Sequence, residues 1–73
     1  MSFIYSYYFV REKLCLERLL KCFSYCEFLK NKPIKKLKYV DDKELIISFG
    51  DMLSLSQLKI ITDLITNATF EEI

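Results

Sequence analysis

Residues 11–30, REKLCLERLLKCFSYCEFLK, decide the fold because they form the longest segment with helical periodicity and hold all three cysteines of the chain. At about 100° per residue, one side of a helix over this range collects apolar residues. This apolar face consists of Cys15, Leu19, Cys22, Phe23, Cys26 and Leu29. Phe28 falls near the polar side, which predicts exposed aromatic surface. We expect the helix to end at Asn31-Lys32-Pro33, because proline disfavours helical geometry in the residue before it.

Two strand-like segments follow, residues 34–40 (IKKLKYV) and residues 44–49 (ELIISF), separated by the polar sequence Asp41-Asp42-Lys43. Alternating side chains around a short acidic turn predict a β-hairpin. The first of these segments has Leu37 and Tyr39 on one face and Lys36 and Lys38 on the other. In the second, Leu45, Ile47 and Phe49 face inward and Ile46 faces outward. Gly50, the only glycine of the chain, marks the end of the hairpin.

Residues 2–10, SFIYSYYFV, are aromatic and β-branched, a composition that favours a strand. One face of this strand would carry Phe3, Tyr5, Tyr7 and Phe9, and the other Ile4, Ser6, Tyr8 and Val10. Both faces are apolar, so the sequence leaves open which of them is buried. A helix that continues into residues 11–30 is the alternative, and the bulky aromatic side chains disfavour it.

A second helix begins at Ser54-Leu55-Ser56-Gln57, which fits a capping box in which side chains satisfy the first backbone N–H groups. One face of this helix carries Leu58, Ile61, Leu64, Ile65 and Ala68. We expect residues 69–73 to be a frayed tail, with Phe70 available as an anchor.

The order strand, helix, strand, strand, helix predicts a single α+β domain over residues 1–73. The simplest arrangement is a compact β-α-β-β-α domain, a three-stranded antiparallel sheet with residues 44–49 in its centre and two helices on one face. This is a ferredoxin-like topology lacking the last strand. The first strand would then have an unpaired edge, and one face of the sheet would have no helix over it.

Composition indicates more apolar surface than the domain can bury. A chain of 73 residues removes only about 60–65% of its unfolded surface from water. Hydrophobic residues nevertheless make up 52% of the chain and aromatic residues 15%. Either the large side chains pack unusually well or part of them stays exposed, and the second case implies a partner.

Cysteine usage and hydropathy indicate a cytoplasmic protein without membrane spans. Three cysteines are an odd number, and their helical spacing differs from a secreted disulfide framework. We find no signal-peptide pattern and no apolar run near the roughly 18 residues that a membrane span requires. Abundant Phe, Tyr, Ile and Lys beside single Gly and Pro residues fit AT-rich codons, which hints at a phage, a virus or a low-GC bacterium.

Catalysis is not expected, and we predict no catalytic residue, cofactor or metal. The chain has no histidine to act as a general base and only one glycine, too few for a phosphate-binding loop. Cys15, Cys22 and Cys26 could form a thiol or metal sensor, but a zinc site normally needs four ligands with a close cysteine pair. We favour the interpretation that the three thiols pack in the core as small apolar groups.

We therefore expect a small non-enzymatic protein-interaction module, in the form of a phage- or virus-encoded inhibitor that occludes a host factor. The expected partner is a protein, and self-association through the first strand or the open sheet face predicts a homodimer. The expected partner-binding residues are Tyr5, Tyr7, Tyr8, Phe28, Tyr39 and Ile46. The three tyrosines of the first strand could equally well pack in the undersized core of the chain itself instead of binding a partner, and the sequence supports both interpretations equally.

A nucleic-acid-binding module is the alternative. Its binding residues would be Lys35, Lys36 and Lys38, with tyrosine rings on the sheet face for base stacking. Lysines that protect an edge strand against aggregation explain the same pattern. Because the formal net charge is only +1, the chain as a whole does not attract a polyanion. We rank nucleic-acid binding second.

Overall fold

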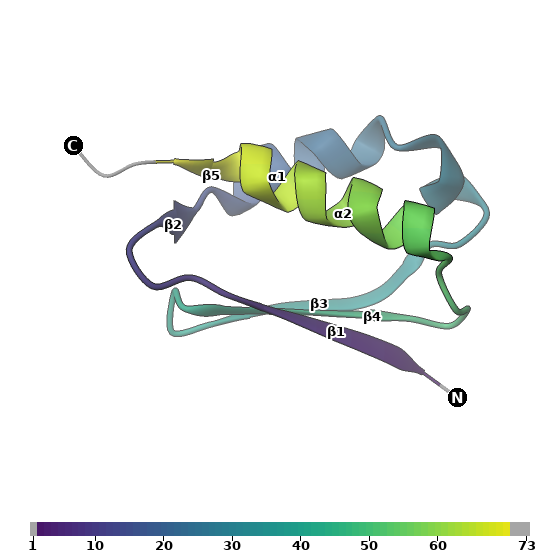
Figure 1. The fold of residues 1–73 in the computed structure, drawn as a ribbon, viewed down its shortest axis with the longest axis horizontal. Coiled ribbons are helices and arrows are strands. Elements are labelled where there is room, and N and C mark those ends of the chain that lie inside the picture. Colours follow the sequence, from purple (N-terminus) through teal and green to yellow (C-terminus); the bar gives the residue numbers. More distant parts are fainter. Residues whose placement is uncertain (1, 71–73) are drawn as a thin grey trace.

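The computed structural model describes residues 2–70 of the chain, which form two α-helices, a short 3-10 helix and five strands. In chain order they are β1 (Phe3–Tyr8), β2 (Lys13–Leu14), α1 (Leu16–Ser24), the 3-10 helix η1 (Glu27–Lys30), β3 (Ile34–Val40), β4 (Glu44–Phe49), α2 (Leu55–Ala68) and β5 (Thr69–Phe70) (Figure 1).

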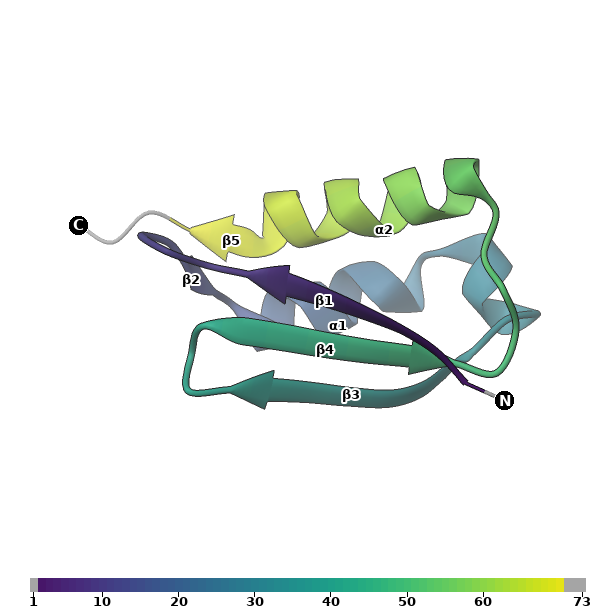
Figure 2. The same ribbon diagram turned by 60° about the horizontal axis from the view of Figure 1, so that its bottom comes forward.

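The main sheet has the order β1-β4-β3, and both strand pairs are antiparallel. Both α-helices lie on one face of this sheet, and within residues 2–70 no helix covers the opposite face (Figure 1, Figure 2). The predicted α+β fold is therefore confirmed, with β4 as the central strand and a ferredoxin-like topology lacking the last strand. β1 and β3 are the two edge strands of the sheet.

The core lies between the central strand and the two helices. The inward side chains of β4, Leu45, Ile47 and Phe49, have no solvent exposure, as predicted. They pack in one cluster with residues of α1 and α2, of which the most buried are Leu19, Phe23, Ile61, Ile65 and Ala68. β1 also contributes its odd-numbered residues to this side, since Tyr5 and Tyr7 are half-buried against the cluster.

The first helix is shorter than the sequence indicates, and the predicted helix over residues 11–30 is wrong in extent. α1 contains nine residues, and the N–H groups of Tyr25 and Cys26 bond to carbonyls three residues back, which tightens its last turn. Cys26 is extended, with φ −84° and ψ 112°, so the chain changes direction before η1. A continuous helix would leave Phe28 beside solvent, whereas the break lets Phe28 and Leu29 pack against the core.

The start of the predicted helix is instead a strand. β2 pairs with β5 in a separate two-stranded sheet, with Leu14 opposite Thr69. Leu14 is only 3% exposed, so this pairing closes one end of the core. The expectation of a tail frayed from Thr69 onward is thus wrong for the backbone of Thr69 and Phe70. The predicted anchoring by the Phe70 side chain and the rest of the tail, residues 71–73, lie outside the described part of the chain.

The capping box of the second helix is present as predicted. The Ser54 hydroxyl accepts a hydrogen bond from the Gln57 backbone N–H at 3.2 Å, and Gln57 Oε1 accepts one from the Ser54 N–H at 2.9 Å. Lys32 Nζ also donates to Gln57 Oε1 at 3.1 Å. The start of α2 is therefore tied to the segment that precedes β3.

The hairpin between β3 and β4 turns through two residues in the left-handed region. Asp41 has φ 53° and Asp42 has φ 57°. The Lys43 N–H donates to the Val40 carbonyl at 3.0 Å and closes the turn. Positive φ at both central positions is the geometry of the type I′ turn, whose twist matches that of the flanking strands. Aspartate tolerates this region better than most residues because its short polar side chain can bond locally.

Candidate protein-interaction surface

The uncovered side of the main sheet forms a three-by-three grid of side chains. Residues paired across antiparallel strands share a face, so the pairing of β1, β4 and β3 fixes this grid. Its three rows are Ile4–Ser48–Lys36, Ser6–Ile46–Lys38 and Tyr8–Glu44–Val40. We call these nine residues the open face.

The open face is divided into an apolar half and a cationic half. On β1, Ile4 is 63% exposed and Tyr8 is 72% exposed. On β3, Lys36 and Lys38 are exposed and flank the central strand. Ile46 is half-buried at the centre of the grid, with Ser6 and Lys38 as its cross-strand neighbours. The face therefore offers exposed apolar contact along β1 and positive charge along β3.

Tyr8 and Glu44 are direct cross-strand neighbours on this face. The hydrogen bond between the Tyr8 hydroxyl and the Glu44 carboxylate raises the pKa of Tyr8, and the negative charge of Glu44 acts in the same direction. Tyr8 is mostly exposed to solvent, so strand pairing rather than burial holds these two groups side by side.

Two of the predicted site residues, Tyr5 and Tyr7, lie on the covered side of the sheet. The Tyr5 ring meets the Phe49 ring edge-on, with centroids 6.0 Å apart. The Tyr7 hydroxyl lies 3.4 Å from Thr62 Oγ1 of α2. Both side chains are half-buried against the core. In the isolated chain these tyrosines extend the core with their hydroxyls near its rim.

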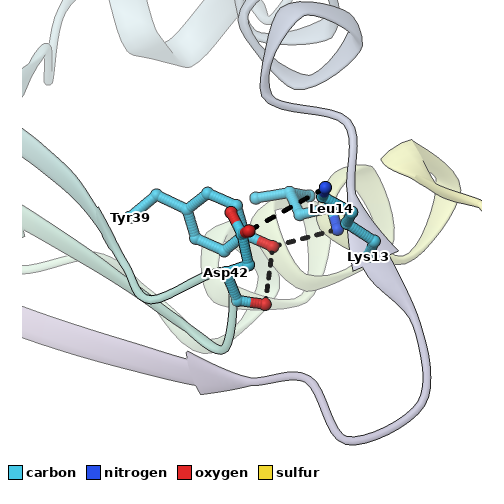
Figure 3. A network of polar contacts seen from close by, with 4 residues as sticks. All are labelled: Lys13, Leu14, Tyr39 and Asp42. Carbon is cyan, nitrogen blue, oxygen red and sulfur yellow. Dashed lines mark hydrogen bonds and ion pairs between the residues drawn. The ribbon is translucent and has the colours of Figure 1, made fainter.

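Tyr39 also lies on the covered side, where it joins three segments (Figure 3). Its hydroxyl accepts a hydrogen bond from the Leu14 N–H at 3.1 Å and donates one to the Asp42 carbonyl at 3.0 Å. Lys13 Nζ lies 3.8 Å from Asp42 Oδ2 across the same junction. The Tyr39 ring packs edge-on against Phe9, with centroids 6.1 Å apart. Of the six predicted partner-binding residues, only Tyr8 and Ile46 belong to the open face.

Phe28 lines a second surface, an apolar groove in the helix layer that we call the helix groove. It has a volume of about 450 Å³ and is lined by Cys22, Tyr25, Cys26, Glu27, Phe28, Ile60 and Leu64. Tyr25 is 76% exposed and Ile60 is 43% exposed, although neither was predicted as a surface residue. Ile60 could have been found from the sequence, since it is apolar and lies off the stripe that the second helix buries.

The prediction that the cysteines pack in the core is wrong. Cys15, Cys22 and Cys26 are free thiols of intermediate exposure, and the side chains that α1 buries are Leu19 and Phe23. The cysteines therefore flank the buried stripe instead of forming it. Among residues 2–70, no three His, Cys, Asp or Glu side chains come together as metal ligands would.

The aromatic residues are better sheltered than the composition suggests. Of the rings whose exposure is described, Phe23 and Phe49 are buried and only Tyr8 and Tyr25 are exposed. The others are half-buried: Phe3, Tyr5, Tyr7, Phe9, Phe28 and Tyr39. Exposed large apolar side chains remain on several elements, and they are Ile4, Tyr8, Val10, Leu20, Tyr25, Met52, Leu55 and Ile60. The β1 half of the open face is one such patch. Ile4, which the sequence reasoning did not select, is the aliphatic member of that patch.

The outer edge of β1 adjoins the open face. The Phe9 N–H donates to the Lys43 carbonyl at 2.8 Å, which fixes the phase of the ladder between β1 and β4. Because hydrogen-bonded and non-hydrogen-bonded pairs alternate in an antiparallel ladder, Ile4, Ser6 and Tyr8 turn their backbone N–H and C=O groups away from β4. Within residues 2–70 no strand pairs with this edge.

A groove of about 200 Å³ lies between the end of β1 and α2, and we call it the edge groove. Its lining residues are Tyr7, Tyr8, Phe9, Glu12, Thr62, Ile65, Thr66 and Thr69. Its walls therefore combine apolar side chains with several hydroxyl groups.

No helix in the described part of the chain has both the length and the apolar character needed to cross a membrane. Comparison of the chain with protein-family models, with curated proteins and with solved structures finds no match.

Proposed function

We propose that this chain is a non-enzymatic protein-interaction module whose partner binds the open face. The observation that carries the proposal is the exposure of Ile4 and Tyr8 on the one sheet face that the helices leave uncovered. Exposed apolar groups beside polar ones are typical of protein-binding surfaces, and tyrosine offers a large contact area at low entropic cost.

The composition of the open face indicates what kind of partner it fits. The apolar half along β1 would pack against apolar or aromatic side chains. Lys36 and Lys38 would attract carboxylates on the same partner, and Glu44 is the only acidic residue among the nine. A partner with an apolar patch bordered by acidic residues has the complementary character.

The open face is one side of a sheet, so its simplest effect on a partner is to cover it. Occlusion needs no catalytic group, which agrees with a sequence that contains no histidine. We propose the cytoplasm as the compartment and a phage- or virus-encoded inhibitor of a host factor as the biological form, on the basis of the free cysteines and an amino-acid composition that fits AT-rich codons.

Site-specific photo-crosslinking in host extract tests this proposal. A photoreactive residue at position 4 or 46 should crosslink the same host protein, whereas one at Lys59, exposed on α2, should not. Tyr8→Glu should abolish capture of that protein and Lys59→Glu should retain it. Equal crosslinking from Lys59, or none from the open face, would reject the proposal.

Nucleic-acid binding is the second candidate, because Lys36 and Lys38 share a face with the exposed Tyr8 ring. Against it, Tyr5, Tyr7 and Tyr39 lie on the covered side, which leaves a single tyrosine for base stacking on the open face. A gel shift with single-stranded DNA and RNA at two salt concentrations separates the candidates. Binding that weakens steeply with salt and is lost in Lys36→Ala/Lys38→Ala would favour nucleic acid over protein.

A further inference from the structure

We infer that the outer edge of β1 binds a second copy of this chain, with the two β1 strands antiparallel about a twofold axis at Ser6. The result is a continuous six-stranded sheet. This inference goes beyond the proposed function, since the dimer forms without the host partner and leaves both open faces uncovered.

The first argument is the unused hydrogen-bonding capacity of the edge. The backbone groups of Ile4, Ser6 and Tyr8 point away from β4, and no strand within residues 2–70 accepts them. Such an edge is a template for another strand, and proteins normally protect it with charge, proline or a bulge. β1 has none of these, because residues 2–10 contain no charged residue and no proline, and its pairing with β4 is regular throughout.

The other edge of the sheet shows the contrast. β3 carries Lys35, Lys36 and Lys38, and its pairing with β4 is interrupted by a register shift between Ile34 and Lys36. Two β3 edges would bring lysines of like charge together, which is destabilising. Pairing of β1 with β3 of another copy would generate an open-ended chain of molecules rather than a closed dimer. Of the possible edge pairs, β1 with β1 of the other copy is therefore the one that avoids both like charges and an open-ended assembly.

The register of the pair follows from the same three residues. Pairing about Ser6 places Ile4 opposite Tyr8 of the other copy and Ser6 opposite Ser6. All three residues whose backbone N–H and C=O groups point away from β4 then form hydrogen bonds across the axis. Shifting the axis to a neighbouring residue leaves at least one of them without a partner in β1. The small Ser6 side chain fits the axis, where two identical side chains meet, and a β-branched residue opposite an aromatic one is a favourable cross-strand pair.

On the covered side, the same register places Tyr5 of the second copy opposite Tyr7, beside the edge groove. This groove already brings the hydroxyls of Tyr7, Thr62 and Thr66 together around apolar side chains. A tyrosine from the second copy matches it, because the ring can contact apolar surface and the hydroxyl can bond to a threonine. Glu12 is the one charged residue among those that line the edge groove.

The oligomeric state tests the inference. Light scattering coupled to size-exclusion chromatography over a wide range of concentrations should give a dimer. Ser6→Arg, which sets two cations against each other at the axis, should raise the dimer dissociation constant by about tenfold or more. Ser56→Arg makes the same change on the exposed start of α2 and should leave the dimer intact.

A backbone variant separates loss of the dimer from loss of the fold. Ser6→Pro removes an outward N–H group but none of those that pair with β4, and proline is tolerated on an edge strand in that orientation. It should give a folded monomer with an unchanged circular dichroism spectrum. A wild-type chain that stays monomeric at high concentration, or a dimer that survives both Ser6→Arg and Ser6→Pro, would overturn the inference.

Crosslinking tests the register itself. In a chain with Cys15, Cys22 and Cys26 replaced by alanine, Ser6→Cys should form an intermolecular disulfide on oxidation. The Cα–Cα distance of a hydrogen-bonded antiparallel pair, about 5.5 Å, lies within the range that disulfides span. Ile4→Cys and Ser56→Cys should crosslink poorly. Equal crosslinking from all three positions would contradict the proposed axis.

Discussion

The hydroxyl of Tyr39 accepts a hydrogen bond from the backbone N–H of Leu14 at 3.1 Å, although 25 residues separate them in sequence. The same hydroxyl donates to the Asp42 carbonyl at 3.0 Å (Figure 3). One oxygen atom therefore joins the short strand β2 to the turn between β3 and β4.

Tyr39→Phe should lower the free energy of unfolding by about 1–2 kcal/mol, because the partly buried Leu14 N–H and the Asp42 carbonyl lose their partner. Chemical denaturation monitored by circular dichroism measures the change. Lys13→Ala is the matched control at the same junction and should cost much less, since the Lys13–Asp42 ion pair is exposed. Equal effects of the two variants would contradict this account of the junction.

Asp41 occupies a left-handed position, with φ 53°. The stability of variants at this position should therefore depend on how well the new residue tolerates positive φ. Asp41→Ala should destabilise the chain by roughly 1 kcal/mol, because alanine has neither the freedom of glycine nor a polar group to bond locally. Asp41→Gly should match or exceed the wild-type stability. Thermal unfolding ranks the three chains, and an alanine variant as stable as the glycine variant would refute the turn geometry.

Stability at high pH should depend on the pair Tyr8 and Glu44. Glu44 raises the pKa of Tyr8 above its ordinary value near 10, so the folded state favours the protonated ring. The stabilising effect is complete below the ordinary tyrosine pKa and is lost as the pH rises through the raised pKa of the folded state.

Carbon-13 NMR titration of the tyrosine rings measures this pKa directly. Glu44→Gln should move the pKa of Tyr8 down toward the ordinary value. Glu27→Gln removes a carboxylate from η1 and should leave the pKa of Tyr8 unchanged. A Tyr8 pKa that does not respond to Glu44→Gln would show that the two groups do not interact.

The capping box gives the most local prediction. Ser54→Ala should destabilise the chain by about 1 kcal/mol, since the Gln57 N–H loses its acceptor at the start of α2. Ser54→Asp keeps an acceptor at the same place and should recover most of the loss. Denaturant unfolding of both variants decides the matter, and no difference between them would argue against capping by this side chain.

The parts of the fold that the sequence predicts correctly are those with local signals. The capping box at Ser54 and Gln57 needs only four residues, and the hairpin needs only alternation around Asp41 and Asp42. Once these elements are known, strand order follows from general rules of connection.

The errors arise where tertiary contacts outweigh local pattern. Periodicity continues through residues 11–30, but pairing of β2 with β5 and the break at Cys26 remove helix from both ends. The facing of β1 shows the same limit, since both of its sides are apolar and only its pairing with β4 places Tyr5 and Tyr7 inward. The candidate surface was therefore only partly predictable, with Tyr8 and Ile46 identified and Ile4 missed.

The order of synthesis leaves β1 open to aggregation for a time, because both of its edges are unpaired until β4 has been made. β1 is synthesised before β4, its one neighbour in the main sheet within residues 2–70, and about 35 residues of chain separate the two strands. The hairpin of β3 and β4 can close quickly because its contacts are local, whereas docking of β1 closes a long loop and comes late. Until then an uncharged, aromatic strand has both edges free. Newly made chains should accordingly depend on chaperones or slow, dilute expression more than their small size suggests.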